Sequence, residues 1–487
     1  MVSRAKYIFV GAALLLVSCA VGPDFKEPAP PPVKSYTEDP VSKTSLASNV
    51  EDGDAQEFQE GVDLEGAWWE VFHSRALSEL VEQSLKENPD MQASQAALAV
   101  AQENVKAQLG AYYPSITATF SGSRQKTSEE IAPVPNSNKF FFNLYTPQLS
   151  ISYVPDVFGL NRRTVESLEA EQDLARYELA ATDITLSSNV VVAAIQEAAL
   201  RGQVEATHQL IDINVTMLNI LKNQLKKGYA SQIDVAAQES QLAQVNATLP
   251  PLLKQLAVQR DLLKALAGQF PAQELKQNFT LADLKLPTEI PLSLPSKLVE
   301  QRPDILQAEA NLHFASASIG IAVANRLPNI TLTADAGDTA LRAGKIFHDG
   351  VDFWDLGGEI TQPIFEGGML WHKEKAARAA YKQALAEYKS TILTAFQNVA
   401  DSLSALIHDA DALKASSEAL SAAKVTLDLS RKQTQSGYAN YLTLLNAEQV
   451  YQQALINLVQ ARANRLSDTA ALFQALGGGW WKRAELS

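Results

Sequence analysis

The chain has 487 residues, of which 46% are hydrophobic and 20% charged, as is typical of an ordered protein with a buried core. Its formal net charge of −14 argues against nucleic acid as a partner, because no basic patch is available to neutralise phosphates. Its single cysteine leaves no intrachain disulfide to form.

Residues 1–18 are expected to form a lipoprotein signal peptide. A basic start precedes an apolar run at 8–17, which is shorter than the about 20 residues that a membrane-spanning helix needs. The run ends in Leu-Val-Ser-Cys19, which resembles the lipobox of bacterial lipoproteins. Cleavage there would leave Cys19 as an acylated N-terminus, and several acyl chains anchor a protein durably. The alternative is an ordinary signal peptide followed by a chance cysteine.

Residues 19–63 are rich in Pro, Ser and acidic residues, and this composition predicts an extended tether. The rest of the chain repeats itself. Four motifs recur in the same order at offsets of 209 to 214 residues: Asn88-Pro89-Asp90 with Arg302-Pro303-Asp304, Pro114-Ser115-Ile116-Thr117 with Pro328-Asn329-Ile330-Thr331, Gly228-Tyr229-Ala230 with Gly437-Tyr438-Ala439, and Ala265-Leu266-Ala267-Gly268 with Ala475-Leu476-Gly477-Gly478. We interpret this as a tandem duplication.

Each repeat is predicted to contain two strands, a very long helix and a second helix. The expected elements are listed here in chain order: the first repeat at 64–270, with strands at about 114–125 and 142–154 and helices at 161–227 and 231–268; a linker at 271–295; the second repeat at 296–478, with strands at about 328–338 and 353–365 and helices at 369–436 and 440–476; and a C-terminal tail at 479–487.

The long helices give the strongest local signal. Residues 161–227 contain no proline and a single glycine, and 369–436 contain neither. At 1.5 Å per residue, each helix would extend about 100 Å. Apolar and small residues between Leu174 and Ala198 alternate spacings of three and four, which indicates a coiled-coil-like seam. A structural coiled coil without a channel would show the same periodicity.

The predicted strands alternate polar and apolar residues. Ile116, Ala118 and Phe120, for example, alternate with Ser115, Thr117 and Thr119. A transmembrane barrel with a wet lumen requires this pattern, although a soluble antiparallel sheet on a core shows it too. An open four-stranded sheet would leave two bare edges in lipid. If the strands span a membrane, several chains must therefore share one barrel. The loops at about 126–141 and 341–352 would then face outside.

The chain resembles the outer-membrane efflux family, the TolC-like proteins of resistance-nodulation-division pumps. The segment from Cys19 to Phe25 (Cys-Ala-Val-Gly-Pro-Asp-Phe) is similar to the mature start of its lipoproteins. Trp68-Trp69-Glu70-Val71-Phe72 resembles its first helical segment. The segment from Gly437 to Glu448 resembles its second periplasmic tip.

This resemblance implies a mainly α fold with a membrane β part. Three chains of four strands would build one twelve-stranded barrel, continued by an α-helical tunnel through the periplasm. The expected function is passive export of small molecules across the outer membrane, as one part of a tripartite pump. The expected partners are two further copies of the chain, a periplasmic adaptor, an inner-membrane resistance-nodulation-division transporter and outer-membrane lipid.

The two helix–turn–helix tips are the predicted adaptor-docking surface. Glycine after a helix C-terminus is a common cap, and this role is expected of Gly228 and Gly437. By the resemblance, both tips also dock the adaptor, with Tyr229, Ala230, Tyr438 and Ala439 presenting surface beside the glycines.

The closed end of the channel departs from the family pattern. Asp234 matches a family gate aspartate, although a solvated helix residue or a charge at a helix N-terminus would explain it as well. Thr434 stands where a tyrosine is usual, Gln435 or Ala439 takes the place of an arginine, and Asn446 replaces the pore-ring aspartate. We therefore expect a gate of neutral hydrogen bonds and Leu442 packing, with weak cation affinity at Asn446.

Three other functions make different demands on the sequence. No catalytic motif, and no cysteine or histidine group with metal-ligand spacing, is found in the sequence, so we expect no enzyme, cofactor or metal site. A coiled-coil lipoprotein without a channel would not need the amphipathic strands. A duct for protein secretion would keep the channel and change the cargo.

Overall fold

The structure, a computed structural model, describes residues 20–39, 41–48, 50–126, 141–436, 438–439, 441–484 and 486. The predicted signal peptide, Cys19, Gly437 and most of the loop at 126–141 lie outside these residues. The chain forms two compact units. Unit 1 comprises Met1–Pro28, Leu98–Leu174 and Ala308–Tyr388, and unit 2 comprises Ala29–Ala97, Ala175–Gln307 and Lys389–Ser487. Each unit takes segments from both sequence repeats, so the units and the repeats do not coincide.

The order of helices and strands is the same in the two repeats. In the first, they are α2 (Arg75–Glu87), α3 (Pro89–Leu109), β2 (Ser115–Lys126), β3 (Phe141–Tyr153), α4 (Leu160–Lys226) and α5 (Gln232–Leu266). In the second, they are α6 (Pro295–Gln301), α7 (Pro303–Ala324), β5 (Asn329–Asp338), β6 (Asp352–Thr361), α8 (Met369–Gln435) and α9 (Tyr441–Ala475). Two short strands, β1 (Glu57–Glu60) and β4 (Glu289–Leu292), lie in the segments before each repeat.

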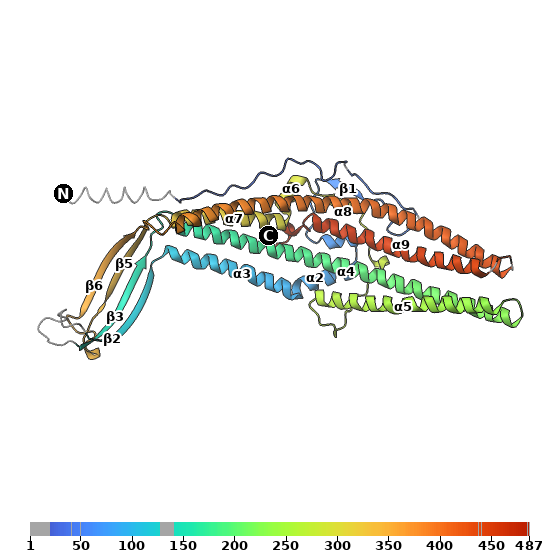
Figure 1. The fold of residues 1–487 in the computed structure, drawn as a ribbon, viewed down its shortest axis with the longest axis horizontal. Helices are drawn as coiled ribbons and strands as arrows, with labels where there is room; N and C mark the ends of the chain where they lie inside the picture. The colour runs from blue at the N-terminus through green and yellow to red at the C-terminus, as the bar shows by residue number, and fades with distance from the viewer. Residues whose placement is uncertain are drawn as a thin grey trace. The chain divides into compact units, whose positions relative to one another are not determined.

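Unit 1 contains a four-stranded antiparallel sheet in the order β2-β3-β5-β6 (Figure 1). Each repeat contributes one β-hairpin, and β3 pairs with β5 where the hairpins meet. The outer strands, β2 and β6, have no further partner among the described residues. The sheet therefore has two open edges within one chain.

The long helices α4 and α8 contain 67 residues each. The predicted seam of α4 is buried from Ile184 to Ala198, but the residues between the seam positions are buried too, including Val190, Ala194 and Ala199. This stretch packs on nearly all sides. The prediction of a single seam therefore underestimated how much of the helix surface is buried. Helix α4 is also long and apolar enough to cross a membrane, yet most of its apolar stretch is buried inside the fold.

The repeated motifs have matching structural roles in unit 2. The side chain of Asn88, which precedes α3, donates a hydrogen bond to the carbonyl of Leu266 at the end of α5, at 3.0 Å. The side chain of Arg302, which precedes α7, donates to the carbonyl of Ala475 at the end of α9, at 2.7 Å. Carbonyls at a helix C-terminus have no partner within the helix. The two motifs therefore cap equivalent helices of the duplication.

The N-terminal segment of unit 2 is held by side chains that its composition did not predict. Strand β1 pairs in parallel with β4. Arg465 of α9, fully buried, donates hydrogen bonds to the carbonyls of Asp52 and Asp54 at 2.7 and 2.6 Å. Arg462 pairs with the Asp52 carboxylate at 2.8 Å. Part of the expected tether is therefore bound to α9. The C-terminal tail is also packed, since the buried Trp480 donates to the carbonyl of Gln301 at 2.7 Å.

Candidate functional site

The sheet of unit 1 has one apolar and one polar face. Register places four residues in a row across the strands, Ile116, Ile151, Ala334 and Leu356, and the next row contains Thr117, Ser150, Asp335 and Asp355. Because neighbouring residues of a strand point to opposite faces, the two rows lie on opposite sides of the sheet.

The apolar face is exposed within the single chain. Ile116, Leu356 and Ile360 are 64%, 73% and 70% exposed. On the polar face, Gln148 donates hydrogen bonds to Asp335 at 2.7 Å and to Ser150 at 2.9 Å. A large exposed apolar surface opposite a hydrogen-bonded polar one is typical of a sheet with lipid on one side and water on the other.

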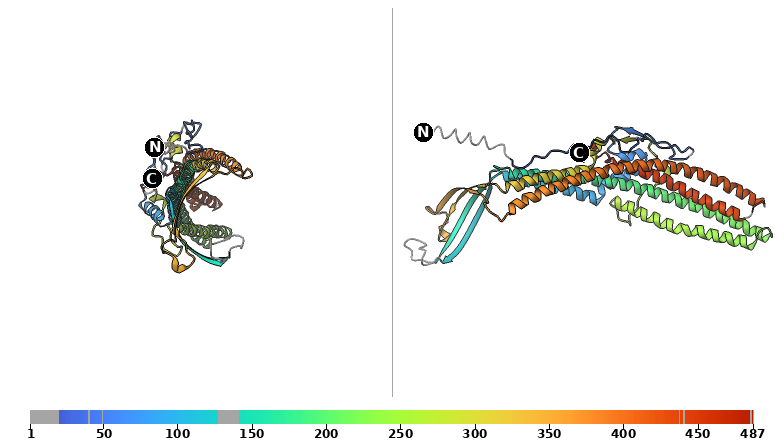
Figure 2. Two further views of the ribbon diagram at one scale, coloured as in Figure 1. Left: turned by 90° about the vertical axis from the view of Figure 1, so that its left-hand side faces the viewer. Right: turned by 45° about the horizontal axis from the view of Figure 1, so that its top comes forward.

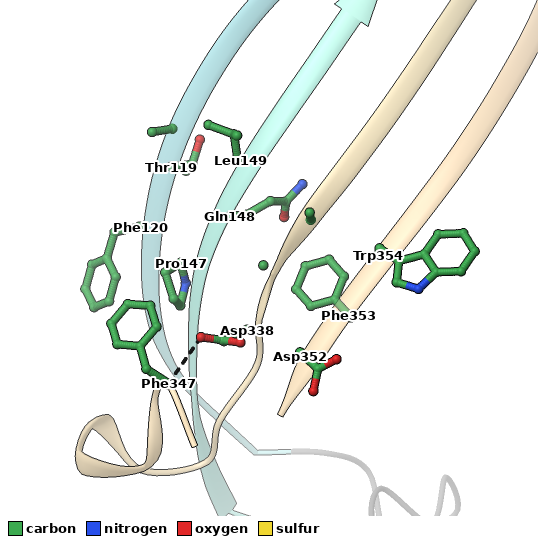
Figure 3. A pocket seen from close by; sticks show the side chains of 13 residues that line it. Thr119, Phe120, Pro147, Gln148, Leu149, Asp338, Phe347, Asp352, Phe353 and Trp354 are labelled. Carbon is green, nitrogen blue, oxygen red and sulfur yellow. Dashed lines mark hydrogen bonds between the residues drawn. The ribbon is translucent and has the colours of Figure 1, made fainter. Parts of the chain in front are cut away.

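A hollow of about 720 Å³ lies on this sheet near the connection from β5 to β6 (Figure 3). Phe120, Pro147 and Phe347 lie at one side of it, and Phe353 and Trp354 lie at the other. The backbone N–H of Phe347 donates to Asp338 at 3.2 Å, which fixes the connection against the strand end. Aromatic side chains at a strand end suit a membrane–water boundary.

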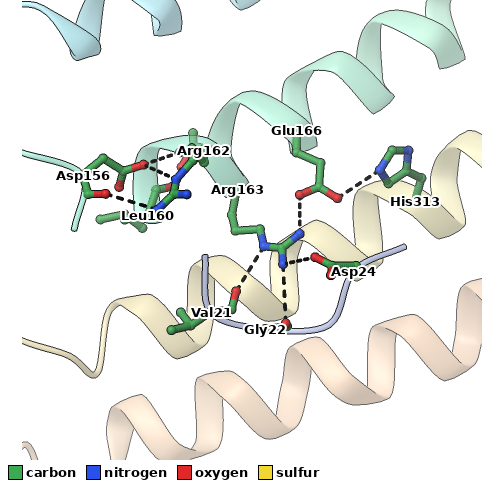
Figure 4. Close-up of polar contacts among 10 residues, drawn as sticks. Val21, Gly22, Asp24, Asp156, Leu160, Arg162, Arg163, Glu166 and His313 are labelled. Atoms are coloured by element: carbon green, nitrogen blue, oxygen red, sulfur yellow. Dashed lines mark hydrogen bonds and ion pairs between the residues drawn. The ribbon is translucent and has the colours of Figure 1, made fainter. Parts of the chain in front are cut away.

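The first described residues are clamped onto α4 and α7, also within unit 1 (Figure 4). The Arg163 guanidinium donates hydrogen bonds to the carbonyls of Val21 and Gly22, at 3.1 and 3.4 Å, and pairs with Asp24 at 2.7 Å. It also pairs with Glu166 at 2.6 Å. The N-terminal segment is thus bound directly after Cys19.

Ring stacking and glycine contacts complete this N-terminal clamp. His313 hydrogen-bonds to Glu166 at 3.1 Å, and its ring stacks on Phe25 with centroids 4.3 Å apart. Gly22 has a φ of +95°, and a Cβ there would lie 2.5 Å from the Cα of Gly320. Only glycine fits this approach. Sequence reasoning identified Asp24 and Phe25 as part of a motif and missed their respective partners, Arg163 and His313.

The first tip joins α4 to α5 in unit 2. Gly228 has a φ of +78°, and the backbone N–H of Tyr229 donates a hydrogen bond to the carbonyl of Gln224 at 2.9 Å. This is the hydrogen-bond pattern of a Schellman cap. Tyr229 is 82% exposed, and Ala230 packs against the apolar cluster of the tip. Asp234 accepts hydrogen bonds from the backbone and the hydroxyl of Ser231, at 2.8 and 2.7 Å.

Asp234 therefore belongs to a capping box at the start of α5. The signal for this role was present in the sequence, because Ser231 and Asp234 have the required spacing of three. The helix-terminus alternative for Asp234 thus has a concrete structural basis in the single chain.

The second tip joins α8 to α9. The backbone N–H of Tyr438 donates a hydrogen bond to the carbonyl of Gln433 at 2.9 Å, and the residue is 89% exposed. Ala439 is half-buried, and Gly437 lies outside the described residues. The two hairpins lie side by side (Figure 2), and they share an apolar cluster. Its buried members are Met217, Leu221, Val235, Leu427, Tyr441, Leu444 and Ala447.

The other predicted gate residues face away from this cluster. Leu442 is 59% exposed, and the fully buried leucine is Leu444. Asn446 and Gln435 are exposed. Gln435 lines a cavity of about 310 Å³ together with Arg431 and Asp212. Within one chain these side chains make no gate, so such a role requires neighbouring copies.

Known proteins are similar to this chain over most of its length. The family model of the outer membrane efflux protein matches residues 80–269 and 294–478. The pyoverdine export outer membrane protein OpmQ of Pseudomonas aeruginosa is 30% identical, over 85% of this chain and 87% of OpmQ. The probable efflux pump outer membrane protein TtgC of Pseudomonas putida is 27% identical, over 97% and 95% of the two chains.

Solved structures give the same result for the fold. The outer-membrane channel OprN superposes with a TM-score of 0.83 at 25% identity, covering 95% of this chain and 100% of OprN. The predicted TolC-like architecture is confirmed, and the part of the chain that the structure describes contains its long helices and its four-stranded sheet. The chain belongs to the outer membrane efflux protein family, whose members are passive outer-membrane channels and not enzymes.

Proposed function

We propose that the protein is the outer-membrane channel of a tripartite efflux pump and conducts small toxic molecules from the periplasm to the exterior. The observation that carries this proposal is the two-faced sheet. Its apolar face is exposed on both outer strands, its polar face has a hydrogen bond from Gln148 to Asp335, and its two edges pair with no other strand among the described residues. Unpaired strand edges are not tolerated in lipid, so the sheet needs further strands to close it.

Three copies of the chain would supply those strands. Strand β2 of one copy would pair with β6 of the next, which gives the twelve-stranded barrel implied by the resemblance. The polar row would line the lumen, and the apolar row would contact lipid. Such a conduit needs no chemistry on its cargo, and the inner-membrane transporter would supply the energy.

The N-terminal clamp supports lipid anchoring at Cys19. Residues from Val21 to Asp24 are fixed on α4 by Arg163, so an acylated Cys19 would be held beside unit 1, which carries the membrane strands. The lipid anchor would therefore insert into the same membrane that the sheet spans, close to the sheet.

Both helical tips support docking of a periplasmic adaptor. Tyr229 and Tyr438 are capped into place by hydrogen bonds, yet their side chains are almost fully exposed. Exposed tyrosines on rigid turns are favourable contact residues, because they bury a large area at a small entropic cost. Gly228, Ala230, Gly437 and Ala439 would form the turns beside them.

The gate is proposed to form where the second tips of three copies meet. The exposed Gln435, Leu442 and Asn446 would face neighbouring copies, with Asp234 near the first tip. Introducing a charge with Asn446→Asp should raise cation selectivity and the affinity of cationic blockers. Unchanged conductance and block in that variant would remove Asn446 from the pore ring.

The cargo is the part of the proposal that rests on relatives. TtgC and OpmQ are named for efflux and pyoverdine export, which favours small molecules over secreted proteins. Purified protein in a planar bilayer should form a trimer that conducts ions. A deletion strain should become sensitive to dyes, detergents or antibiotics. A monomer that conducts nothing would overturn the channel function.

A further inference from the structure

The two tip hairpins have a cation and a glutamate at equivalent positions, and these form an ion pair in the first hairpin but not in the second. Helices α4 and α8 each have 67 residues, and α5 and α9 each have 35. Aligned by these helices, Lys222 corresponds to Arg431 and Glu239 to Glu448. In the first hairpin, Lys222 and Glu239 form an exposed ion pair at 2.8 Å. In the second, no ion pair joins Arg431 to Glu448.

Glu448 is instead buried beside the apolar cluster of the tips. Its exposed fraction is 2%, and neither of its carboxylate oxygens has a hydrogen-bond partner among the described residues. It lies one turn after Leu444 and two turns after Tyr441, which puts all three on one face of α9. Both are buried members of the cluster. An isolated carboxylate is costly in such surroundings unless it takes up a proton or finds a cation.

Other polar groups at this tip are also left without partners. The Tyr441 hydroxyl and the Thr434 hydroxyl are buried and make no hydrogen bond to the described residues. In the first hairpin, Ser231 and Asp234 close a capping box and Gln238 donates to the Asn214 side chain at 2.8 Å, and only the Gln238 side-chain oxygen is buried without a partner among the described residues. The second hairpin therefore leaves more of its buried polar atoms without partners than the first does.

We propose that Arg431 and Glu448 form a proton-controlled latch of the second hairpin. With Glu448 protonated, α8 and α9 keep the packing seen here. With Glu448 ionised, the hairpin rearranges to make the ion pair that Lys222 and Glu239 already make in the first hairpin. A cavity of about 310 Å³, lined by residues of α4 and α8, gives the Arg431 side chain room to change its conformation. The inference rests on the proposed role of the second tip as a gate.

Burial and the nearby cation act on the Glu448 pKa in opposite directions, and burial has the larger effect. Burial raises the pKa of the Glu448 carboxyl to about 7, against the opposing charge of Arg431 on α8. Burial, with Glu448 and then Asp234 of α5 adding to it, raises the pKa of the Tyr441 hydroxyl, which therefore stays neutral. From α4, Asp212 lines the cavity next to Arg431.

The direction of the pH effect follows from proton linkage. A solvated glutamate has the ordinary pKa of 4.5, whereas the buried one keeps its proton to about pH 7. The packing seen here is therefore fully favoured below about pH 4.5, and it loses that advantage as the pH rises through 7. The latch releases at neutral pH and closes in acid.

Hydrogen–deuterium exchange of the full-length trimer in detergent tests the latch. Amides of 425–450 are compared with those of the equivalent 216–241 at pH 5.5 and pH 8, after correction for the intrinsic rate at each pH. We expect exchange in the second hairpin to be faster at pH 8 by about tenfold or more, because one pKa unit is a factor of about ten. The first hairpin should show no such change.

Three variants distinguish the latch from other effects of pH on hydrogen exchange. Glu448→Gln should abolish the pH dependence, whereas the matched Glu239→Gln in the first hairpin should leave it intact. Arg431→Gln should move the transition to higher pH, because the opposing charge is lost. A pH response that persists in Glu448→Gln, or none in the wild type, would overturn the proposal. Because exchange requires no conductance, a trimer that shows the pH response but passes no ions would contradict only the channel function.

Discussion

The guanidinium of Arg163 lies 2.7 Å from the carboxylate of Asp24, although the Arg163 side chain is 5% exposed and that of Asp24 is 89% exposed. A buried cation on α4 thus meets an anion on the segment that follows Cys19. Two backbone carbonyls and Glu166 take up further Arg163 donors. The segment after Cys19 is therefore part of the fold of unit 1.

Replacing Arg163 by Gln should free this segment. The change leaves the carbonyls of Val21 and Gly22 and the Glu166 carboxylate without their cation, and losing a hydrogen bond to a charged group costs about 1.5–3 kcal/mol. We expect faster tryptic cleavage after Lys26, detected by mass spectrometry, and a lower Tm. Arg162→Gln is the control, because Arg162 pairs with Asp156 instead. Cleavage of Arg163→Gln at the wild-type rate would show that the clamp does not hold the segment.

The two faces of the sheet should respond differently to the same charge. Leu356→Arg places a cation on the exposed apolar row, where it should cost about 2–4 kcal/mol near the bilayer midplane. Thr117→Arg places it on the polar row and should be tolerated. Both variants are inserted into lipid vesicles, and the fraction of trimer that resists heating is measured for each. Equal loss for the two variants would contradict the assignment of lipid and lumen faces.

The tip tyrosines should matter for partners and not for folding. Tyr229→Ala and Tyr438→Ala remove side chains that are 82% and 89% exposed, so the free energy of unfolding should change by about 0.5 kcal/mol or less. Adaptor binding and drug resistance should fall. Phe270→Ala is a matched control, because Phe270 is 77% exposed but lies outside the tips. Full resistance in the double tyrosine variant would exclude the tips as a docking surface.

Local patterns were sufficient to predict the regular elements. Long runs without proline or glycine predicted α4 and α8, and alternation predicted the strands that the structure places from Ser115 to Lys126 and from Asn329 to Asp338. The duplication predicted that both repeats share one order of elements. These features depend on neighbours in sequence, which is why they could be read without a structure.

Contacts between distant segments were not predictable in this way. Strand β1 has four residues and pairs with β4 more than 200 positions away, so neither strand carries a pattern long enough to recognise. The burial of Glu448 was also not predictable, because the equivalent position of the first repeat, Glu239, has the same residue type and yet is exposed. Arg163 looked like an ordinary helix cation until the N-terminal segment was placed against it.

Stability should also depend on pH through Asp409 on α8 of unit 2, whose side chain is half-buried. Burial, with the adjacent Asp468 adding to it, raises the pKa of Asp409 to about 7, and Arg465 opposes this. In the unfolded chain the carboxyl loses its proton near pH 3.8, so the folded state is favoured most in acid and loses stability as the pH rises from about 4 to 7.

Asp409→Asn should flatten the change of Tm between pH 5 and pH 8, whereas Asp401→Asn, on an exposed position of the same helix, should not. Combined with Glu448→Gln, it should remove most of the slope. Because Asp409 lies outside the tip cluster, its substitution should leave the pH response of exchange in 425–450 unchanged, and loss of that response would mean that the two carboxyls titrate as one system.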